Sequence, residues 1–385
     1  MTRKMSEQFP RSYKVLEQGV VEGVAPGFVA GIWQKSDPDF FEIAAVGQRR
    51  LALRGLSALP METHSIFDLA SVTKVFATAT LAGVLVDRGW LTWETPLQSL
   101  VPEYRHPQIL IKHLLSHTAG LPAWAPLYEK MREHFLPRPL ISVSVLDRQK
   151  QMRKFVCEIQ PEKAVGEVAL YSDISFLLLG FALEAVIQMP LDVAVRKFVW
   201  DAMDLTKKGS GPFYHHTVQE SFLGHKKARG LSLNEAVAAT EDCPWRGGVL
   251  QGEVHDDNCW SMGGYGGHAG AFATAQDVLK FSAHLMAGFL SPKTQTEMWT
   301  RMPGFDRTLG WDTPSGAEPA FTKHFSPGVV GHLGYTGTSL WIDPERGLAV
   351  TLLSNRVHPS RENTRIKAFR SRFHEALWQD LDSNV

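Results

Sequence analysis

Ser71 and Lys74 are two residues whose types and spacing could do chemistry. On a helix, side chains three positions apart share a face, so the serine hydroxyl and the lysine amine meet within hydrogen-bond reach. A serine needs a partner that removes its proton, and a lysine that loses its charge by desolvation can be that base. A helix N-terminus beside Ser71 adds positive potential and a backbone amide for an oxyanion. The pair therefore predicts a nucleophile and a base for acyl transfer.

The surroundings of Lys74 bear on a simpler interpretation, in which the lysine chain only extends to solvent. From Ser71 to Val86, apolar side chains occupy nearly every face of the predicted helix, and Lys74 is its only charge. A buried lysine without a partner is costly or changes its protonation state, so it is rarely kept without a task. We expect Lys74 to be buried and active.

The segment Ser65–Lys74 resembles the active-site segment of the β-lactamase-like serine hydrolases, the superfamily of penicillin-recognising enzymes. This superfamily includes class C β-lactamases, D-alanyl-D-alanine peptidases and family VIII esterases. Its three signatures are S-x-x-K, Y-x-N and K-T-G or a variant. Ser71 and Lys74 match the first signature, and the resemblance implies that both residues are catalytic.

The second signature resembles Tyr171-Ser172-Asp173, about a hundred residues further on and directly before an apolar stretch that begins at Ile174. The resemblance implies that Tyr171 is catalytic and carries a proton between nucleophile and leaving group, assisted by Lys74. Asp173 replaces the usual Asn at a substrate-binding position; an ionised acid accepts from Lys74 but cannot donate as an amide does. In a second interpretation, Asp173 only caps the helix and Tyr171 is an ordinary strand aromatic.

The third signature resembles Gly331–Gly337, with His332 where a lysine is common. The resemblance implies substrate binding by His332 and by Gly334, which lets the substrate approach the strand. It also implies that the backbone amides of Ser71 and Tyr335 form the oxyanion hole. A histidine is neutral for much of the time near pH 7, so it would hold a substrate carboxylate less firmly than a lysine. Without the resemblance, His332 would be interpreted as a surface residue of a strand.

Three further segments match the same superfamily, namely Leu114–Leu121, Gly266–Gly270 and Ser354–Arg356. The resemblance thus extends from about Gly27 to Leu377, and the order and spacing of the motifs make it specific. His117 and His268 lie in two of these segments, and we expect both to brace loops.

A polar tract over residues 239–258 resembles a subgroup that includes penicillin-binding-protein-4-like and muropeptide-processing members. One interpretation assigns substrate selection to this tract. The other treats it as loops held by their own ion pairs.

Apolar runs at both ends of the chain predict strands. Phe28–Trp33 and Phe40–Val46 predict one hairpin, and Ser339–Ile342 with Leu348–Leu353 predict another. An apolar stripe over Ile366–Leu377 predicts a final helix that covers a sheet. We therefore expect an α+β fold of the β-lactamase/transpeptidase-like type, whose antiparallel sheet is flanked by helices and built from both chain ends.

The middle of the chain is mostly helical, with a buried helix expected over Ile174–Gln188. We assign residues 1–89 and 264–385 to the sheet domain and residues 90–263 to a mostly helical inserted domain. Periodicity fades between Leu205 and Gly264, where we expect a loop-rich tract.

Composition excludes several classes of function. Lys plus Arg and Asp plus Glu each number 40, and no basic block recurs, so no nucleic-acid partner is expected. The three cysteines lack the C-x-x-C spacing of a zinc site, and we expect neither a metal nor a cofactor. We see no signal-peptide core, and the longest apolar runs are shorter than the ~20 residues that cross a bilayer. We therefore expect a cytoplasmic protein with no membrane span.

Together these observations predict a serine hydrolase that acts through an acyl-enzyme on a D-alanyl peptide, a β-lactam or a related amide. One alternative is a carboxylesterase of the family VIII type. Another is a catalytically weak protein that binds penicillin or peptidoglycan fragments, because Asp173 and His332 replace the common residues. In each case the partner is a small-molecule or peptide acyl donor. The sequence assigns no oligomeric state.

Overall fold

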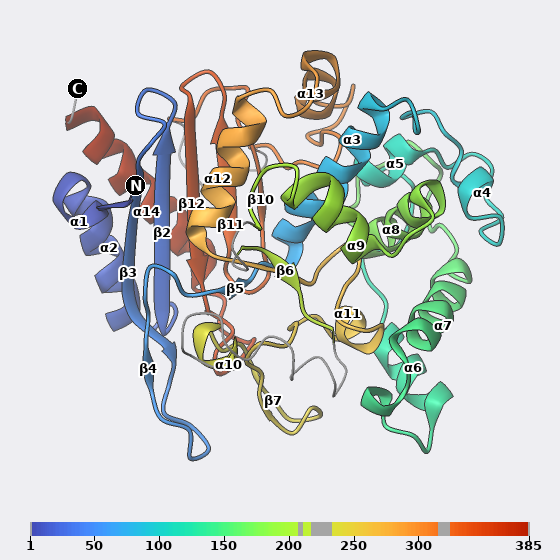
Figure 1. The fold of residues 1–385 in the computed structure, drawn as a ribbon, viewed down its shortest axis with the longest axis horizontal. Helices are drawn as coiled ribbons and strands as arrows, with labels where there is room; N and C mark the ends of the chain where they lie inside the picture. The colour runs from blue at the N-terminus through green and yellow to red at the C-terminus, as the bar shows by residue number, and fades with distance from the viewer. Residues whose placement is uncertain (1, 207–210, 217–232, 315–323, 384–385) are drawn as a thin grey trace.

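The central element of the structure is a mixed sheet assembled from both ends of the chain (Figure 1). The computed structural model describes residues 2–206, 211–216, 233–314 and 324–383. The strands run in the order β1-β3-β2-β12-β11-β10, and β4 pairs with β3 beside this path. Their bounds are β1 (Thr2–Lys4), β2 (Gly27–Gln34), β3 (Phe41–Arg50), β4 (Leu59–Pro60), β10 (Val330–Leu333), β11 (Ser339–Asp343) and β12 (Leu348–Ser354).

The two predicted hairpins are confirmed, and they meet in the middle of the sheet. β2 pairs antiparallel with β3, β11 pairs antiparallel with β12, and Ala30 of β2 lies opposite Leu352 of β12. The sheet is therefore built from both chain ends, as expected for an α+β fold. One pairing differs from the expected antiparallel pattern, because β1 runs parallel to β3, with Arg3 opposite Glu42.

Both faces of the sheet are buried, so its central strands are apolar on both sides. Alternate residues of β2 point to opposite faces: Phe28 and Ile32 join one hydrophobic cluster, and Val29 joins the other. Helices α1 (Met5–Gln8), α2 (Pro10–Val21) and α14 (Ile366–Ser383) cover the first face (Figure 1). Helix α12 (Ala275–Met286) covers the second face. The predicted C-terminal helix is confirmed.

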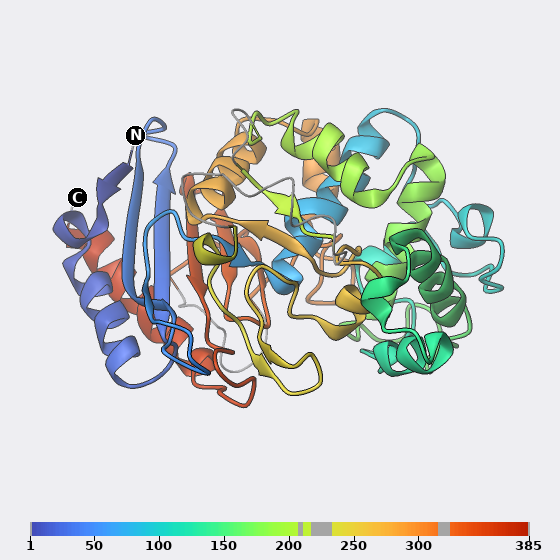
Figure 2. The ribbon, with the colours of Figure 1, turned by 60° about the horizontal axis from the view of Figure 1, so that its bottom comes forward.

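A mostly helical region lies beside the second face of the sheet, seen clearly in Figure 2. Its elements are α4 (Leu97–Leu100), α5 (Ile111–Leu115), α6 (Leu127–Phe135), a 3₁₀ turn (Leu140–Ser142), α7 (Val145–Cys157), α8 (Asp173–Ile187), α9 (Leu191–Val195), a π-helical turn (Arg196–Trp200) and α11 (Asp257–Ser261). The expected buried helix is α8, which ends at Gln188 in the left-handed conformation. Part of the expected loop-rich tract, at 207–210 and 217–232, lies outside the described residues.

The remaining elements are short and connect these two regions. They are β5 (Phe67–Asp68), β6 (Phe213–Tyr214), α10 (Leu233–Ala236), β7 (Asp242–Cys243), β8 (Gly248–Val249), β9 (Ala271–Ala273) and α13 (Pro292–Trp299). β5, β9 and β6 form a small antiparallel sheet. Phe67 pairs there with Ala273, which ties the segment before Ser71 to the segment before α12.

The helix predicted over Ser71–Val86 exists, but its geometry changes along its length. It begins as a 3₁₀ turn (Ala70–Val72), continues as a π-helical segment (Lys74–Ala79) and ends as α3 (Thr80–Asp87). The Thr80 hydroxyl donates to the carbonyl of Val75, five residues earlier, at 2.6 Å. A side chain that enters the backbone ladder in this way favours a local π bulge.

Within the described residues, the window Ala70–Asp87 is long and apolar enough to cross a membrane by length and composition, with a mean hydropathy of 1.3. However, 83% of this window is buried inside the fold. A core helix of a protein domain meets the same criteria of length and composition, because apolar side chains of the domain surround it in place of lipid. The helix is apolar on all sides because the sheet and the helical region enclose it.

Phe369 of α14 supplies a measure of how strongly the outer helices hold the sheet. Its ring stacks on Phe28 of β2 at a centroid distance of 4.7 Å, and its side chain is buried. We expect Phe369→Ala to lower the free energy of unfolding by about 3–5 kcal/mol, because it removes buried surface and leaves a cavity. Denaturant unfolding measures this loss. Val21→Ala, at a side chain that is 88% exposed, is the control and should change stability by less than about 0.5 kcal/mol. Equal losses in the two variants would contradict the prediction.

Candidate active site

Ser71 lies where the sheet meets the helical region, directly after a residue with an unusual backbone. Ala70 has a φ of +46°, in the left-handed region that few residues other than glycine adopt. The carboxylate of Asp68 accepts the Ala70 amide at 2.8 Å and the His255 amide at 2.6 Å, which holds this conformation. Such strain persists only where the surroundings impose it, and it is common at functional sites. The side chain of Ser71 is partly exposed.

The side chain of Lys74 is fully buried and reaches Ser71, as expected from the spacing. Its ammonium group donates to three oxygens: Ser71 Oγ at 3.0 Å, Asp173 Oδ1 at 2.7 Å and the His268 carbonyl at 3.1 Å. The contact with Asp173 agrees with the expectation that an acid at this position accepts from Lys74. Asp173 arrives from α8, 99 positions away in the sequence, and supplies the opposite charge.

The Lys74–Asp173 pair changes the expected protonation of the site. Burial lowers the pKa of Lys74, but the carboxylate of Asp173 and the phenol of Tyr171 raise it by more, so the net direction is upward. Lys74 is thus an ammonium at neutral pH, and its three protons are matched by three acceptors. In this resting state it holds the Ser71 oxygen but cannot take the serine proton.

Tyr171 lies over Lys74, with the ammonium nitrogen 4.8 Å from the ring centroid. Its hydroxyl is buried beside Lys74 and Ser71. Burial raises the pKa of Tyr171, while the charge of Lys74 and hydrogen bonding to Lys74 and Ser71 lower it in part, so the net direction is upward. Tyr171 is therefore a neutral phenol next to the serine.

The second interpretation of this motif, a capping Asp173 and a strand tyrosine, is wrong. The N-cap of α8 is Ser172, whose hydroxyl accepts the Ser175 amide, and Tyr171 precedes the helix in a loop. His117 braces this loop as expected, because its Nδ1 accepts the Ser172 amide at 3.1 Å and its ring packs on Tyr171 at 4.7 Å.

His332 on β10 is buried, and its ring lies 5.9 Å from that of Tyr171. The interpretation as a surface residue is therefore wrong. Its Nδ1 lies 2.8 Å from the Leu333 carbonyl, so that nitrogen carries the proton. Burial, with Lys74 and Arg307 adding to the effect, lowers the pKa of His332 to about 3. His332 is uncharged at neutral pH and supplies no cation where the superfamily commonly has a lysine.

The turn after β10 is fastened to the segment before Ser71. The hydroxyls of Thr336 and Thr338 donate to the carbonyls of Asp68 and Leu69, at 2.8 and 2.9 Å. Gly334 lies against the same segment, since a Cβ there would come within 2.6 Å of the Leu69 carbonyl. The structure thus gives a further reason for glycine at this position, namely close packing of the protein against itself.

Two arginines from the C-terminal part of the chain bind the backbone carbonyls of this turn. Arg370 of α14 donates to the carbonyls of Gly334 and Thr338, at 3.1 and 2.8 Å. Arg356 donates to the Tyr335 carbonyl at 2.7 Å and lies 4.3 Å from the centre of its ring. Tyr335 is 52% exposed, so its ring faces solvent while its backbone is fixed. The Ser354–Arg356 match signalled Arg356, but nothing in the sequence signalled the role of Arg370.

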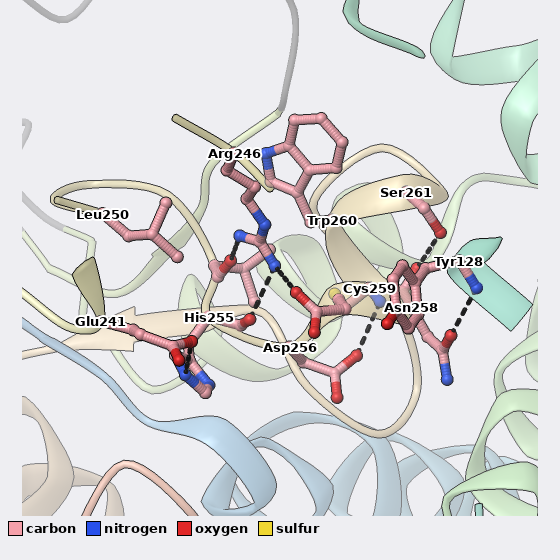
Figure 3. Close-up of polar contacts among 12 residues, drawn as sticks. Tyr128, Glu241, Arg246, Leu250, His255, Asp256, Asn258, Cys259, Trp260 and Ser261 are labelled. Atoms are coloured by element: carbon pink, nitrogen blue, oxygen red, sulfur yellow. Dashed lines mark hydrogen bonds and ion pairs between the residues drawn. The ribbon is translucent and has the colours of Figure 1, made fainter. Parts of the chain in front are cut away.

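The tract over 239–258 is held by ion pairs (Figure 3). Arg246 lies 2.5 Å from Asp257, and His255 lies 3.2 Å from Glu241. Arg361, which follows β12, binds both carboxylates at once. His255 and Arg361 together outweigh burial and lower the pKa of Glu241 to about 2. These contacts agree with the interpretation of the tract as loops held by their own ion pairs. Arg361, from the C-terminal end of the chain, takes part in addition.

This tract is also connected to the site. His268, whose carbonyl binds Lys74, has its Nε2 2.9 Å from Asp256. The ring of His255 stacks on Tyr335 at 5.8 Å. His268 thus braces a loop, as expected, and the network fixes positions around Ser71. Among the described residues, no group of three or more His, Cys, Asp or Glu side chains is placed to hold a metal ion.

Arg307 and Asp312 are two site residues that sequence reasoning missed. Arg307 Cζ lies 5.7 Å from the centroid of the Tyr171 ring, and its Nη1 lies 2.6 Å from Asp312 Oδ1. The two residues belong to the irregular segment between α13 and β10, which has no apolar periodicity and no motif. Only the folded chain reveals their place.

Comparisons with known proteins agree with this fold and site. The model of the family described as Beta-lactamase matches residues 14–371. A relative from Salmonella agona, named "Putative D-alanyl-D-alanine carboxypeptidase", is 29% identical over 330 residues, which cover 79% of this chain and 72% of the relative. Among solved structures, EstCE1, described as a hydrolase with promiscuous acyltransferase activity, has a TM-score of 0.71 at 20% identity and covers 97% of this chain and 99% of its own.

A second solved structure is the D-amino acid amidase from Ochrobactrum anthropi SV3, with a TM-score of 0.66 at 18% identity, covering 98% of this chain and 99% of the amidase. These two likenesses show a fold of the β-lactamase/transpeptidase-like type. Because the family model spans most of the sequence, the chain belongs to the beta-lactamase family. The resemblance inferred from the motifs is confirmed.

The Asp173 carboxylate should control the pH at which the site becomes active. Asp173→Asn removes the main group that raises the pKa of Lys74, so burial then dominates and the pKa falls. If reaction needs neutral Lys74, the acidic limb of the profile of kcat/KM against pH moves to lower pH in this variant. Steady-state kinetics with p-nitrophenyl acetate measures the limb. Asp192→Asn, which removes a carboxylate bound to His216, is the control and should leave it in place. An unmoved limb in Asp173→Asn would contradict this assignment.

Proposed function

We propose that this protein is a serine hydrolase that forms an acyl-enzyme on Ser71. The observation that carries the proposal is the contact of 3.0 Å between Lys74 Nζ and Ser71 Oγ inside a buried, charge-balanced pair. The buried, neutral phenol of Tyr171 lies over the same lysine. This combination supplies a nucleophile, a proton acceptor once Lys74 is neutral, and a proton donor.

The proton route follows from the resting charges. Lys74 can accept the serine proton only after it has lost one of its own protons to solvent, and Asp173 makes that loss harder because its carboxylate raises the pKa of Lys74. The serine oxygen then attacks the acyl carbon and its proton passes to Lys74. Tyr171 donates its proton to the leaving group as the bond between that group and the acyl carbon breaks, and Tyr171 takes a proton back from Lys74. Water then attacks the acyl-enzyme and gives one proton to Lys74, which returns it to the Ser71 oxygen as the bond from that oxygen to the acyl carbon breaks and the acid product leaves.

The oxyanion of this reaction needs two donors that are fixed before the substrate arrives. The backbone amides of Ser71 and Tyr335 are our candidates. Support comes from the rigid junction between their segments, in which Thr336 and Thr338 bind the carbonyls of Asp68 and Leu69.

Two classes of acyl donor have support. The relatives' name supports a D-alanyl peptide or a related amide, such as a β-lactam. The neutral state of His332 supports an ester instead, because a free D-alanyl terminus or a β-lactam carries a carboxylate that gains from a cation. A binding protein without turnover is the further candidate, since resting Lys74 is fully occupied by its three acceptors.

Covalent labelling tests the proposal directly. We expect a fluorophosphonate or a fluorescent penicillin to label the wild-type protein and not Ser71→Ala, because both reagents acylate or phosphonylate an activated serine. In-gel fluorescence and intact mass spectrometry detect the adduct. Ser282→Ala, which removes a buried hydroxyl of α12, is the matched control and should retain labelling. If neither reagent labels the wild-type protein, the binding protein becomes the better interpretation.

Loss of the Lys74 amine should slow acylation without unfolding the protein. We expect Lys74→Ala to lower the acylation rate by at least about 100-fold, the lower range for losing a proton-transfer group. Stopped-flow kinetics measures this rate. Because Asp173 would be left buried without its opposite charge, the double variant Lys74→Ala/Asp173→Asn is made in parallel to restore the charge balance. Lys112→Ala, at a surface ion pair with Glu94, is the control. Near-normal acylation in the double variant would remove Lys74 from the mechanism.

A further inference from the structure

The ion pair between Arg307 and Asp312 borders the active site on the side of β10. Asp312 exchanges two backbone hydrogen bonds with Gly331, the residue before His332, at 2.8 and 2.9 Å. Its carboxylate binds Arg307 at 2.6 Å and also accepts the Thr313 amide at 3.0 Å. The carboxylate is thus fixed beside the strand that would bind the substrate.

Arg307 extends from this carboxylate toward Tyr171. Its guanidinium carbon lies 5.7 Å from the Tyr171 ring centroid, and its side chain is 22% exposed. Burial lowers the pKa values of His117 and His332, and the positive charge of Arg307 lowers both further. Since Tyr171 is the proposed donor to the leaving group, Arg307 lies on the leaving-group side of Ser71.

The charged side chains of Lys74 and Arg307, near Tyr171, are each paired with a carboxylate. Lys74 is balanced by Asp173, and Arg307 is balanced by Asp312. His332, at the position where a lysine is common in the superfamily, is neutral. A guanidinium is present, but its strongest partner is already a carboxylate of the protein.

We propose that the Arg307–Asp312 ion pair makes the leaving-group side of this site select acyl donors whose leaving group carries no carboxylate. A substrate carboxylate that approached Arg307 would have to displace Asp312. Asp312 would then be left partly buried without its opposite charge, and this loss offsets the attraction to Arg307. An uncharged leaving group avoids the exchange.

This inference rests on the proposed function and narrows its substrate class. A peptide with a free C-terminal D-alanine has a leaving group with a carboxylate, so it is disfavoured. Esters of alcohols or phenols, and amides without an adjacent carboxylate, are favoured. The selecting device is the acid at position 312, since without it Arg307 would be a free cation beside Tyr171.

A matched pair of esters tests this selection. Phenyl acetate and 3-carboxyphenyl acetate transfer the same acyl group, and only the second has a carboxylate on the leaving group. The readout is the ratio of kcat/KM for the carboxylated ester to that for the uncharged ester. We expect this ratio to rise by at least about tenfold in Asp312→Asn, because a freed Arg307 then gains a charged hydrogen-bond partner. Asp343→Asn, at a buried carboxylate on the far end of β11, is the matched control and should leave the ratio unchanged.

A second variant guards against a folding defect in the first. Arg307→Gln/Asp312→Asn removes both charges and leaves no unpaired group, and we expect its ratio to stay within about threefold of wild type. If Arg307 instead binds substrate carboxylates in the wild-type protein, the double variant selectively loses the carboxylated ester. That result, or an unchanged ratio in folded Asp312→Asn, would overturn the proposal.

A binding measurement separates this inference from the proposed function. In the Ser71→Ala background, NMR titration compares 3-hydroxybenzoate with phenol, the two leaving groups, and needs no turnover. We expect Asp312→Asn to strengthen binding of 3-hydroxybenzoate relative to phenol by the same factor of about ten. If Ser71 is never labelled but this shift is seen, the acyl-enzyme fails and the charge selection stands. If labelling succeeds and the shift is absent, the charge selection fails alone.

Discussion

The buried contact between Lys74 and Asp173 is the constraint on which the rest of the site depends. An ammonium enclosed by apolar side chains is tolerated because a carboxylate and two further oxygens accept its three protons. The contact joins the helix of Ser71 to the start of α8, so it also fixes the position of this helix relative to the helical region. The pKa of Lys74 in the folded state lies above its ordinary value, so the stabilisation from the Lys74 charge is present at neutral pH and is lost as the pH rises through that raised pKa.

Ser71 is positioned by segments that are far apart in the chain. Asp68 holds the strained backbone of Ala70, the threonines after β10 bind the carbonyls before Ser71, and Arg370 fixes the turn from α14. Because the sheet is built from both chain ends, its last strands return beside the segment that follows its first strands. The geometry at Ser71 is thus a product of the whole topology, and local helix formation supplies only the spacing to Lys74.

Charge around the site is balanced at short range. Lys74 pairs with Asp173, Arg307 with Asp312, and Arg361 with Glu241 and Asp257 in the tract behind Tyr335. Partly buried charges that are paired and hydrogen-bonded stay fixed, whereas a free one would attract solvent or an ion. These ion pairs hold the charged side chains in fixed positions, and the Arg307–Asp312 pair is the basis of the substrate selection proposed above.

The sequence by itself determined the strands at both ends, the C-terminal helix, helix α8 and the candidate pair Ser71 and Lys74, because these depend on local periodicity and on motif spacing. It did not determine that Lys74 is paired, that Ala70 is strained, or that Arg307 faces Tyr171. Those features depend on which segments meet in space: Asp173 lies 99 positions from Lys74, Arg307 lies 136 positions from Tyr171, and the carboxylate that holds Ala70 is also bound by the distant His255. Protonation was decided by the tertiary structure alone, since the pKa of a buried group is set by its desolvation and by the charges that the fold brings beside it.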